Sequence, residues 1–298
     1  MPAFLRPLIL GALALFCLAL PSYSSAQTAP STKSGAPANA NEPTISANPG
    51  TVVRWTTPGA RRCTMKARSW AALAGTCYFP IDLEEPAWQI SISVIGTGPK
   101  RLAHISVEPF DYGTEEVTLP DIPQANPSPE DMKRDVRDRA QLGRIWHRPE
   151  APAKFALPLG EPLHPLPPGK SFGVKRVYNG KLAEQMHMGS DYDAPVNSPI
   201  LAVADGTVVL AKELFFEGNA VFIDHGDGLV SEYFHLANIN VKVGQRVRKG
   251  ATLGREGSTG RATGPHLWFG VRWHDARIDP KFLLEAPTRI PSVNKATP

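Results

Sequence analysis

Short apolar stretches separated by turn residues fill the chain from Pro152 to Pro287. Asp205 and Gly206 separate residues 199–204 from 207–211, and similar breaks follow at 217–219 and 224–228. Breaks rich in Asp, Asn and Gly between short β-rich stretches are typical of hairpins. We therefore predict that residues 151–287 form one β domain built from successive hairpins.

The stretch VKVGQRVRKGATLG adds detail to that domain. It spaces apolar residues and glycines like the tight corners of a compact barrel-sandwich: Val243, Gly244, Val247, Gly250, Leu253 and Gly254. Biotinyl and lipoyl carrier domains have similar corners, but a carrier needs a Lys flanked by Met, or by Asp and Met, at a hairpin tip. No such Lys occurs in this region, so the carrier interpretation lacks its attachment residue.

Residues 43–120 show a second β pattern. Apolar stretches at 51–55, 88–95 and 102–107 alternate with Gly and Pro. Ile90, Ile92 and Val94 alternate with Ser91 and Ser93, which is the period-two signature of a half-buried strand. We predict a small antiparallel β-sandwich here. With 298 residues the chain has room for about two such domains.

One helix is expected in the linker region, residues 121–150. Ser128 can cap it, Pro129 suits the first helical position, and Asp131 completes a start like a capping box. An apolar stripe of Met132, Val136 and Ala140, continued by Trp146, predicts the face that docks on a neighbouring domain. Acidic and basic residues are interleaved on the other sides, which favours a connecting helix over a basic binding helix.

The first residues predict export. Arg6 precedes an apolar run from Leu8 to Leu20, and small residues at 24–26 offer a cleavage point, so residues 1–26 resemble a signal peptide. The run is short for a membrane span, although an uncleaved anchor is the alternative. Residues 27–42 are polar and poor in apolar side chains, so we expect a disordered linker, and residues 288–298 are expected to form a tail.

Removal of the signal peptide would leave two cysteines, Cys63 and Cys77, in an oxidising compartment, either the periplasm or outside the cell. We expect a disulfide between them, with two buried free thiols as the alternative. No membrane span is expected after signal removal. The net charge of +4 suits an anionic cell wall but also an ordinary surface, and no dense Lys and Arg run predicts nucleic-acid binding.

Three motifs in the C-terminal region carry the functional signal. HMGSD supplies His187 and Asp191, EYFHL supplies His235, and TGPHLWF supplies His266. Each is weak alone, since a lone His is more often structural. Their order and their context, within GSDYDAP, VADGTVV, VFIDHGDGL and GSTGRATGPHL, make the set much more specific.

This ordered set resembles the LytM/lysostaphin-type zinc peptidoglycan endopeptidases, over about 140 residues of the C-terminal half. The segment PSPEDMKRDVRDRA also looks like proteobacterial members with a β-rich N-terminal domain. The resemblance implies one zinc ion held by His187, Asp191 and the last residue of a His-x-His motif. It implies that His235 and His266 orient or deprotonate the zinc-bound water and stabilise the oxyanion.

The third ligand departs from this pattern. Where the family has the second His of His-x-His, this sequence has Trp268. Indole offers one N–H donor and no free lone pair, so it cannot bind zinc. Catalytic zinc normally keeps three protein ligands and one open position. Residues two apart on a strand share a face, so we expect His266 and Trp268 to face the site and Leu267 and Phe269 the core.

Three functions are compatible with this sequence. The first is a degenerate domain, with zinc weak or absent, that binds peptidoglycan or regulates a cell-wall hydrolase such as an amidase, and whose Trp268 offers an aromatic platform. The second is a working zinc endopeptidase in which His266 or His235 replaces the lost ligand. The third is a structural envelope protein with relic histidines. The missing lone pair favours the first.

The remaining histidines have structural interpretations. His225 is expected in a turn, and His274 in a turn or at the surface, while no motif surrounds the other three, which are His104, His147 and His164. Tyr178 and Asn179 precede the first motif, and they either line the groove or pack at a strand end.

Overall fold

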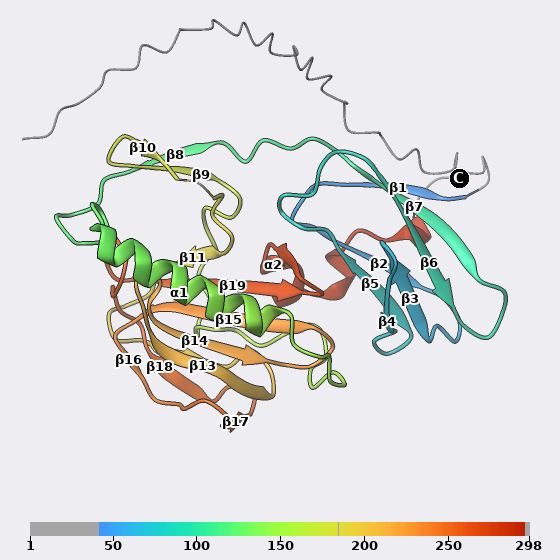
Figure 1. Cartoon of the computed structure of the whole chain (residues 1–298). Coiled ribbons are helices and arrows are strands. Elements are labelled where there is room, and N and C mark those ends of the chain that lie inside the picture. Colours follow the sequence, from blue (N-terminus) through green and yellow to red (C-terminus); the bar gives the residue numbers. More distant parts are fainter. Residues whose placement is uncertain (1–41, 184, 296–298) are drawn as a thin grey trace, which may run out of the picture. The chain divides into compact units, whose positions relative to one another are not determined.

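The computed structural model describes residues 42–183 and 185–295. The predicted signal peptide and all but the last residue of the predicted linker lie outside the described residues. In the described part the chain is mainly β, with an N-terminal β region, one long helix and a C-terminal β domain (Figure 1). Within these residues no helix is long and apolar enough to cross a bilayer.

The N-terminal region forms a five-stranded sheet of order β1-β7-β6-β3-β4 and a two-stranded sheet of β2 and β5. The strands are β1 (Thr44–Ala47), β2 (Val52–Thr56), β3 (Arg62–Met65), β4 (Arg68–Ala71), β5 (Thr76–Pro80), β6 (Gln89–Ile95) and β7 (Arg101–Val107). Ile90, Ile92 and Val94 are buried in its core, as their alternation predicts. The expectation of a purely antiparallel sandwich is wrong at one edge, because β1 pairs with β7 in parallel.

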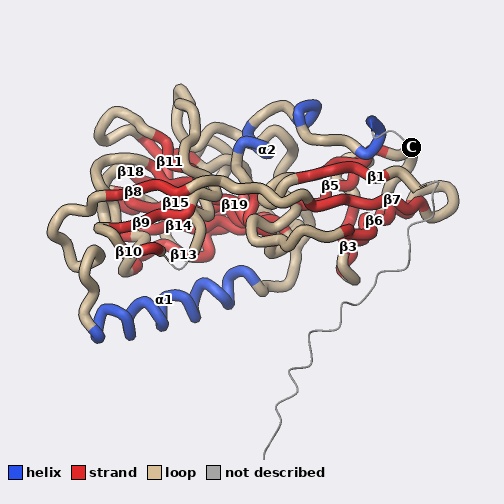
Figure 2. The backbone as a smooth tube through the Cα atoms, turned by 90° about the horizontal axis from the view of Figure 1, so that it is seen from above, coloured by secondary structure: helices blue, strands red, loops and turns tan. Residues whose placement is uncertain are grey.

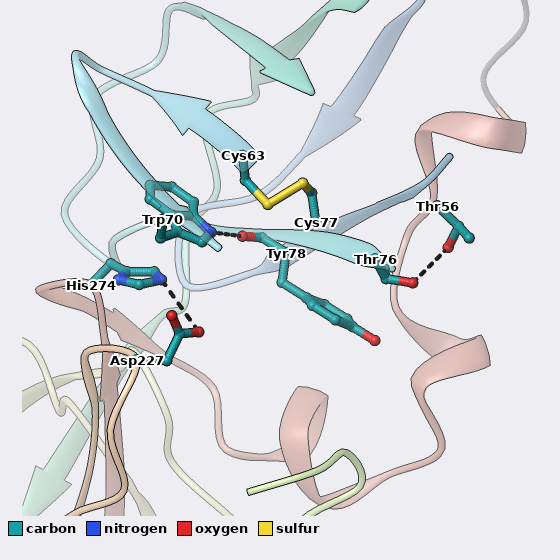
Figure 3. Close-up of a disulfide and its surroundings, with 8 residues drawn as sticks. All are labelled: Thr56, Cys63, Trp70, Thr76, Cys77, Tyr78, Asp227 and His274. Carbon is teal, nitrogen blue, oxygen red and sulfur yellow. Dashed lines mark hydrogen bonds and ion pairs between the residues drawn. A yellow bond between two sulfur atoms is a disulfide. The ribbon is translucent and has the colours of Figure 1, made fainter. Parts of the chain in front are cut away.

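A disulfide joins Cys63 on β3 to Cys77 on β5, 14 residues apart (Figure 3). It links the two sheets of this region, and both cysteines are fully buried. Beside it, the indole of Trp70 donates a hydrogen bond to the carbonyl of Tyr78 and stacks on the ring of His274 at 4.2 Å. His274 therefore lies in a turn, as expected, but it is buried against the N-terminal region rather than at the surface.

The boundaries of the predicted N-terminal domain and tail differ from the structure. The strand β8 (Thr114–Val117) pairs in parallel with β9 (Lys175–Tyr178), which also pairs with β10 (Lys181–Leu182), so it does not join the sandwich. The described part of the predicted tail, up to residue 295, is packed as well: it begins within the short 3-10 turn η1 (Pro287–Arg289) and contains η2 (Val293–Lys295), and Val293 is buried in the N-terminal core.

The helix α1 (Pro129–Trp146) begins as predicted, with Ser128 as its cap and a capping box closed by Asp131. The predicted docking stripe is wrong at Met132 and Val136, which are 40% and 64% exposed, but Trp146 packs against the C-terminal domain as predicted. The buried residues of the helix are Asp135, Asp138, Leu142 and Ile145. Figure 2 shows the helix running along one face of the C-terminal sheet.

Buried aspartates are tolerated on this face because they have partners. Asp138 accepts hydrogen bonds from the backbone N–H of Phe215 and from Lys212, while Asp135 pairs with Arg139. A buried carboxylate that is hydrogen-bonded and paired loses most of its desolvation penalty. The charged residues of the helix therefore help to dock it.

The C-terminal domain contains a seven-stranded sheet of order β11-β19-β15-β14-β13-β17, with β20 beside β19, and a three-stranded sheet of β12, β18 and β16. The strands are β11 (Ser190–Tyr192), β12 (Pro199–Leu201), β13 (Gly206–Leu214), β14 (Gly218–Asp224), β15 (Leu229–Leu236), β16 (Asn238–Ile239), β17 (Arg246–Val247), β18 (Thr252–Arg255), β19 (Leu267–Trp273) and β20 (Ala276–Ile278), followed by the short helix α2 (Lys281–Leu284).

Two of the predicted hairpins are present and one is wrong. Residues 215–217 join β13 to β14 and residues 225–228 join β14 to β15, close to the predicted breaks at 217–219 and 224–228. The Asp205-Gly206 break instead separates strands of different sheets, because β12 pairs with β18. Leu267 and Phe269 are fully buried in the main core, which leaves Trp268 on the opposite face of β19.

Candidate functional site

The first motif lies beside the middle strands of the large sheet. Asp191, on β11, is the cross-strand partner of Trp268 on β19. The Nδ1 atom of His187 lies 2.9 Å from the carbonyl of Ser171, which fixes its ring. Its Nε2 atom then lies 3.4 Å from Oδ1 of Asp191, and neither atom has a hydrogen-bond partner among the described residues although both are buried. Two potential metal donors are thus side by side and free.

A cation not identified from the sequence holds Asp191. The guanidinium of Arg176, on β9, forms an ion pair with this carboxylate and a second with Glu115 at 3.1 Å. Burial alone would raise the pKa of Asp191, but the adjacent His187 and Arg176 outweigh it and hold that pKa well below its usual range. The carboxylate therefore stays ionised.

His266 also reaches Asp191. It precedes β19 and forms an isolated bridge with Gly257, and its Nδ1 atom lies 2.9 Å from the carbonyl of Gly264. Its Nε2 atom lies 3.5 Å from the same Oδ1 that His187 approaches. The two imidazoles therefore flank one carboxylate oxygen.

His235 completes the group of polar side chains. It sits on β15 with a positive φ of 63°, and its Nδ1 atom lies 2.8 Å from the carbonyl of Thr259. Its ring centre is 4.9 Å from that of His266. Burial, assisted by His266, lowers the pKa of His235 to about 3. A neutral imidazole whose Nδ1 binds a carbonyl presents Nε2 as an acceptor.

Trp268 occupies the remaining side. Its indole is stacked on the ring of Phe234, with centroids 4.0 Å apart and planes 3° from parallel, and it meets His187 edge-on at 6.1 Å. A Cβ at Gly189 or Gly270 would come within 2.5 Å of it. With 6% exposure it belongs to the core cluster beneath α1, but it also lines a hollow there, so the aromatic platform stays a prediction.

These side chains match a catalytic zinc site only in part. His187 and Asp191 supply two donors with the right chemistry, and Trp268, where the resemblance implies a third ligand, has no lone pair to offer. Across residues 42–183 and 185–295 no group of three His, Cys, Asp or Glu side chains is placed to hold one metal ion. The approach of His266 to Asp191 is pairwise and does not complete such a group. The set present does not fit a catalytic zinc ion.

Two hollows adjoin the site. Hollow 1, of about 580 Å³, lies beneath α1 and is lined by His187, His235 and Trp268 among others. Hollow 2, of about 420 Å³, is lined by Asp191, His266 and Lys170 among others. Arg176, Tyr178 and Arg261 line both hollows. A ligand in either hollow would therefore meet the site and these three residues.

The other residues singled out from the sequence lie partly in the site and partly away from it. Tyr178 lines the hollows, but Asn179 pairs with the backbone of Leu119 and serves the strand end. His225 is fully buried, with its ring nitrogens 2.8 Å from the carbonyl of Asp205 and 2.7 Å from the hydroxyl of Ser231, which is a structural role. Arg176, Arg261 and Phe234 were missed: Arg176 lies outside the three motifs, and Arg261 and Phe234 lie inside or beside them but were given no role.

The comparisons with known proteins concern mainly the C-terminal domain. Residues 185–280 match peptidase family M23. Over 99 residues the chain is 41% identical to the peptidoglycan DD-endopeptidase ShyC of Vibrio cholerae, which covers 33% of this chain and 23% of ShyC. Over 121 residues it is 37% identical to the cell division protein DipM of Caulobacter vibrioides, covering 40% of this chain and 18% of DipM. The chain thus spans about a quarter or less of the length of these relatives.

A solved structure extends the similarity beyond the C-terminal domain. An M23-type protein from Pseudomonas aeruginosa superposes with a TM-score of 0.60 and 29% sequence identity. The match covers 82% of this chain and 96% of that chain. The arrangement of N-terminal β region, helix and C-terminal β domain is therefore shared with that protein.

Proposed function

We propose, from the match of residues 185–280 to peptidase family M23 and the similarity to a peptidoglycan endopeptidase, that this chain is a cell-envelope protein that binds peptidoglycan without cutting it. It acts through this binding or by regulating a cell-wall hydrolase. An amidase is the partner to test first. Zinc is bound weakly or not at all. The predicted signal peptide supports a periplasmic or secreted location.

One observation supports the proposal: Trp268, where the resemblance implies the third ligand, has its indole built into the core by the stack on Phe234. A side chain with no lone pair cannot replace a residue that binds the metal. Loss of even a residue that only orients a ligand costs roughly 10- to 100-fold in metal affinity or activity. The hollows beside the site remain open, so the domain can still bind peptidoglycan when it no longer hydrolyses it.

A second function is supported by one distance. His266 lies 3.5 Å from the carboxylate oxygen that His187 also approaches, so it is the nearest replacement ligand for an active zinc endopeptidase. In that case His266 would leave its catalytic role and His235 alone would remain to move a proton. This is the alternative that experiments must separate.

The test is incubation of the purified chain with peptidoglycan sacculi, followed by sedimentation and chromatography of the supernatant. We expect the protein in the pellet and no soluble muropeptides. Release of muropeptides that disappears in His187→Ala would support the endopeptidase instead. Failure to sediment, with no change in the rate of an added amidase, would refute the proposed function.

A further inference from the structure

Arg261 lies in the GSTGRATGPHL segment around the third motif, but neither zinc binding nor proton transfer gives it a role. It lies in the loop of residues 257–266, five positions before His266. The carbonyls of this loop hold both histidines, since Thr259 contacts Nδ1 of His235 and Gly264 contacts Nδ1 of His266. A side chain on this loop is therefore positioned together with them.

The loop is anchored tightly at Arg261. The backbone N–H of Arg261 donates to the carbonyl of Phe216 at 2.8 Å, and the hydroxyl of Thr259 accepts from the N–H of Asn219 at 2.9 Å. Gly218 and Gly260 pass so closely that a Cβ on either would collide with the other segment. The backbone of this loop has little freedom, so the position of the Cα atom of Arg261 is fixed.

Two aromatic rings hold the guanidinium. Its Cζ atom lies 4.4 Å from the ring centre of Tyr178 and 4.4 Å from that of Phe216. Rings against a planar guanidinium cover its faces and leave the N–H groups at its edge available. A cation that is oriented in this way loses little side-chain entropy when it binds a ligand.

Its charge has no carboxylate partner in the part of the chain that the structure describes. Of the three cations that line hollow 2, Lys170 pairs with Asp193 and Arg176 pairs with Asp191 and Glu115. Arg261 has no carboxylate within 4 Å among those residues, and its side chain makes no hydrogen bond with them. Burial raises the pKa of the Glu217 carboxyl, and it outweighs the charge of Arg261, which acts from a longer distance and lowers that pKa.

We infer that Arg261 is a specificity residue that binds a free carboxylate of a peptidoglycan stem peptide, with the peptide lying in hollow 2 beside Asp191 and His266. The inference rests on the proposed function, because it assumes that the site receives peptidoglycan. The planar fork of Arg matches the two oxygens of a carboxylate. The negative charge of Asp191, already neutralised by Arg176, would not repel such a ligand strongly.

The test uses a fluorescent pentapeptide, L-Ala–γ-D-Glu–L-Lys–D-Ala–D-Ala, and the same peptide with both α-carboxylates converted to carboxamides. Affinities are measured by fluorescence polarisation with the native full chain, Arg261→Gln and Arg261→Lys. Arg248→Gln is the matched control, because Arg248 is exposed and lines neither hollow, and its substitution removes the same charge.

We expect the native chain and Arg248→Gln to prefer the acid peptide by about 10- to 100-fold, as for a charge-assisted hydrogen-bonded pair. Arg261→Gln should bind both peptides equally, and Arg261→Lys should keep only part of the preference because it loses the planar fork. The affinity of both variants for the amide peptide should stay unchanged, which verifies that the site is folded.

Two results would overturn the inference while leaving the proposed function intact. One is equal binding of the two peptides by the native chain. The other is an unchanged acid-to-amide ratio in Arg261→Gln, even if both affinities fall together, since a purely structural arginine would give that result. Absence of binding to either peptide, together with failure to sediment with sacculi, would reject the inference and the proposed function together.

Discussion

Replacement of Trp268 by histidine isolates the residue on which the proposed loss of zinc chemistry depends. Asp191 is its cross-strand partner and the ring of His187 is 6.1 Å from the indole, so an imidazole at position 268 would point toward both donors. It would also leave part of the indole volume empty beside Phe234. Trp268 is 94% buried, and truncation of a buried Trp to Ala costs about 3–5 kcal/mol, so we expect Trp268→His to lose about 2–3 kcal/mol without metal.

Zinc should reverse this loss in the variant only. A ligand that binds the folded state at 100 times its Kd adds about 2.7 kcal/mol to stability. The assay is urea unfolding with and without zinc for the native chain, Trp268→His and Trp268→Phe. The phenylalanine variant is the control, because it also shrinks the side chain but offers no lone pair.

Hydrolysis is the second readout of the same variant. If Trp268 is the sole defect, Trp268→His should release soluble muropeptides from sacculi, and addition of His187→Ala should abolish the release. A variant that takes up zinc but cuts nothing would show that the groove has diverged as well. Equal stabilisation of the native chain and Trp268→His by zinc would refute the reasoning about the indole.

Three further predictions follow from the fold. Reduction of the Cys63–Cys77 bond, which closes a loop with a separation of 14 residues, should cost about 3 kcal/mol, and mass spectrometry of the unreduced protein should find neither thiol alkylatable. Leu142→Ala on the buried face of α1 should cost about 2–5 kcal/mol in urea unfolding, whereas Val136→Ala on its exposed face should stay within about 0.5 kcal/mol. Burial and the nearby Glu150 raise the pKa of Asp227 to about 7, so the folded state holds a proton that the unfolded state releases between about pH 4 and 7. Stability should therefore fall across that range as pH rises, by a few kcal/mol at most, and Asp227→Asn should remove this fall; an unchanged slope in the variant would contradict the assignment.

Local signals in the sequence predict the elements whose partners are near in the chain. The start of α1 depends on Ser128, Pro129 and Asp131, which lie within one turn of each other, and the structure has this cap. The buried face of the same helix was predicted wrongly, because Asp138 is stabilised by Lys212 and by the backbone of Phe215, far along the chain. A hydrophobic pattern cannot reveal partners that only the fold provides.

In the site, too, residues marked by local motifs were predicted and residues brought in by distant partners were not. The motif residues His187, Asp191, His235 and His266 come together as the resemblance implies, and their roles remain predictions. Arg176 and Phe234 could not be found in this way, since one reaches Asp191 from another sheet and the other meets Trp268 only through pairing of β15 with β19. Non-local strand pairing also explains why β8 was assigned to the wrong domain.

The zinc content of the purified native chain tests the central claim most directly. The protein is dialysed against a mild chelator and its zinc is measured by elemental analysis per mole of chain. Because Trp268 offers no lone pair and His187 and Asp191 supply two donors, we expect far less than one zinc ion per chain. Retention of one zinc ion per chain, lost in His187→Ala, would contradict the claim and would identify His266 as the replacement ligand to test next.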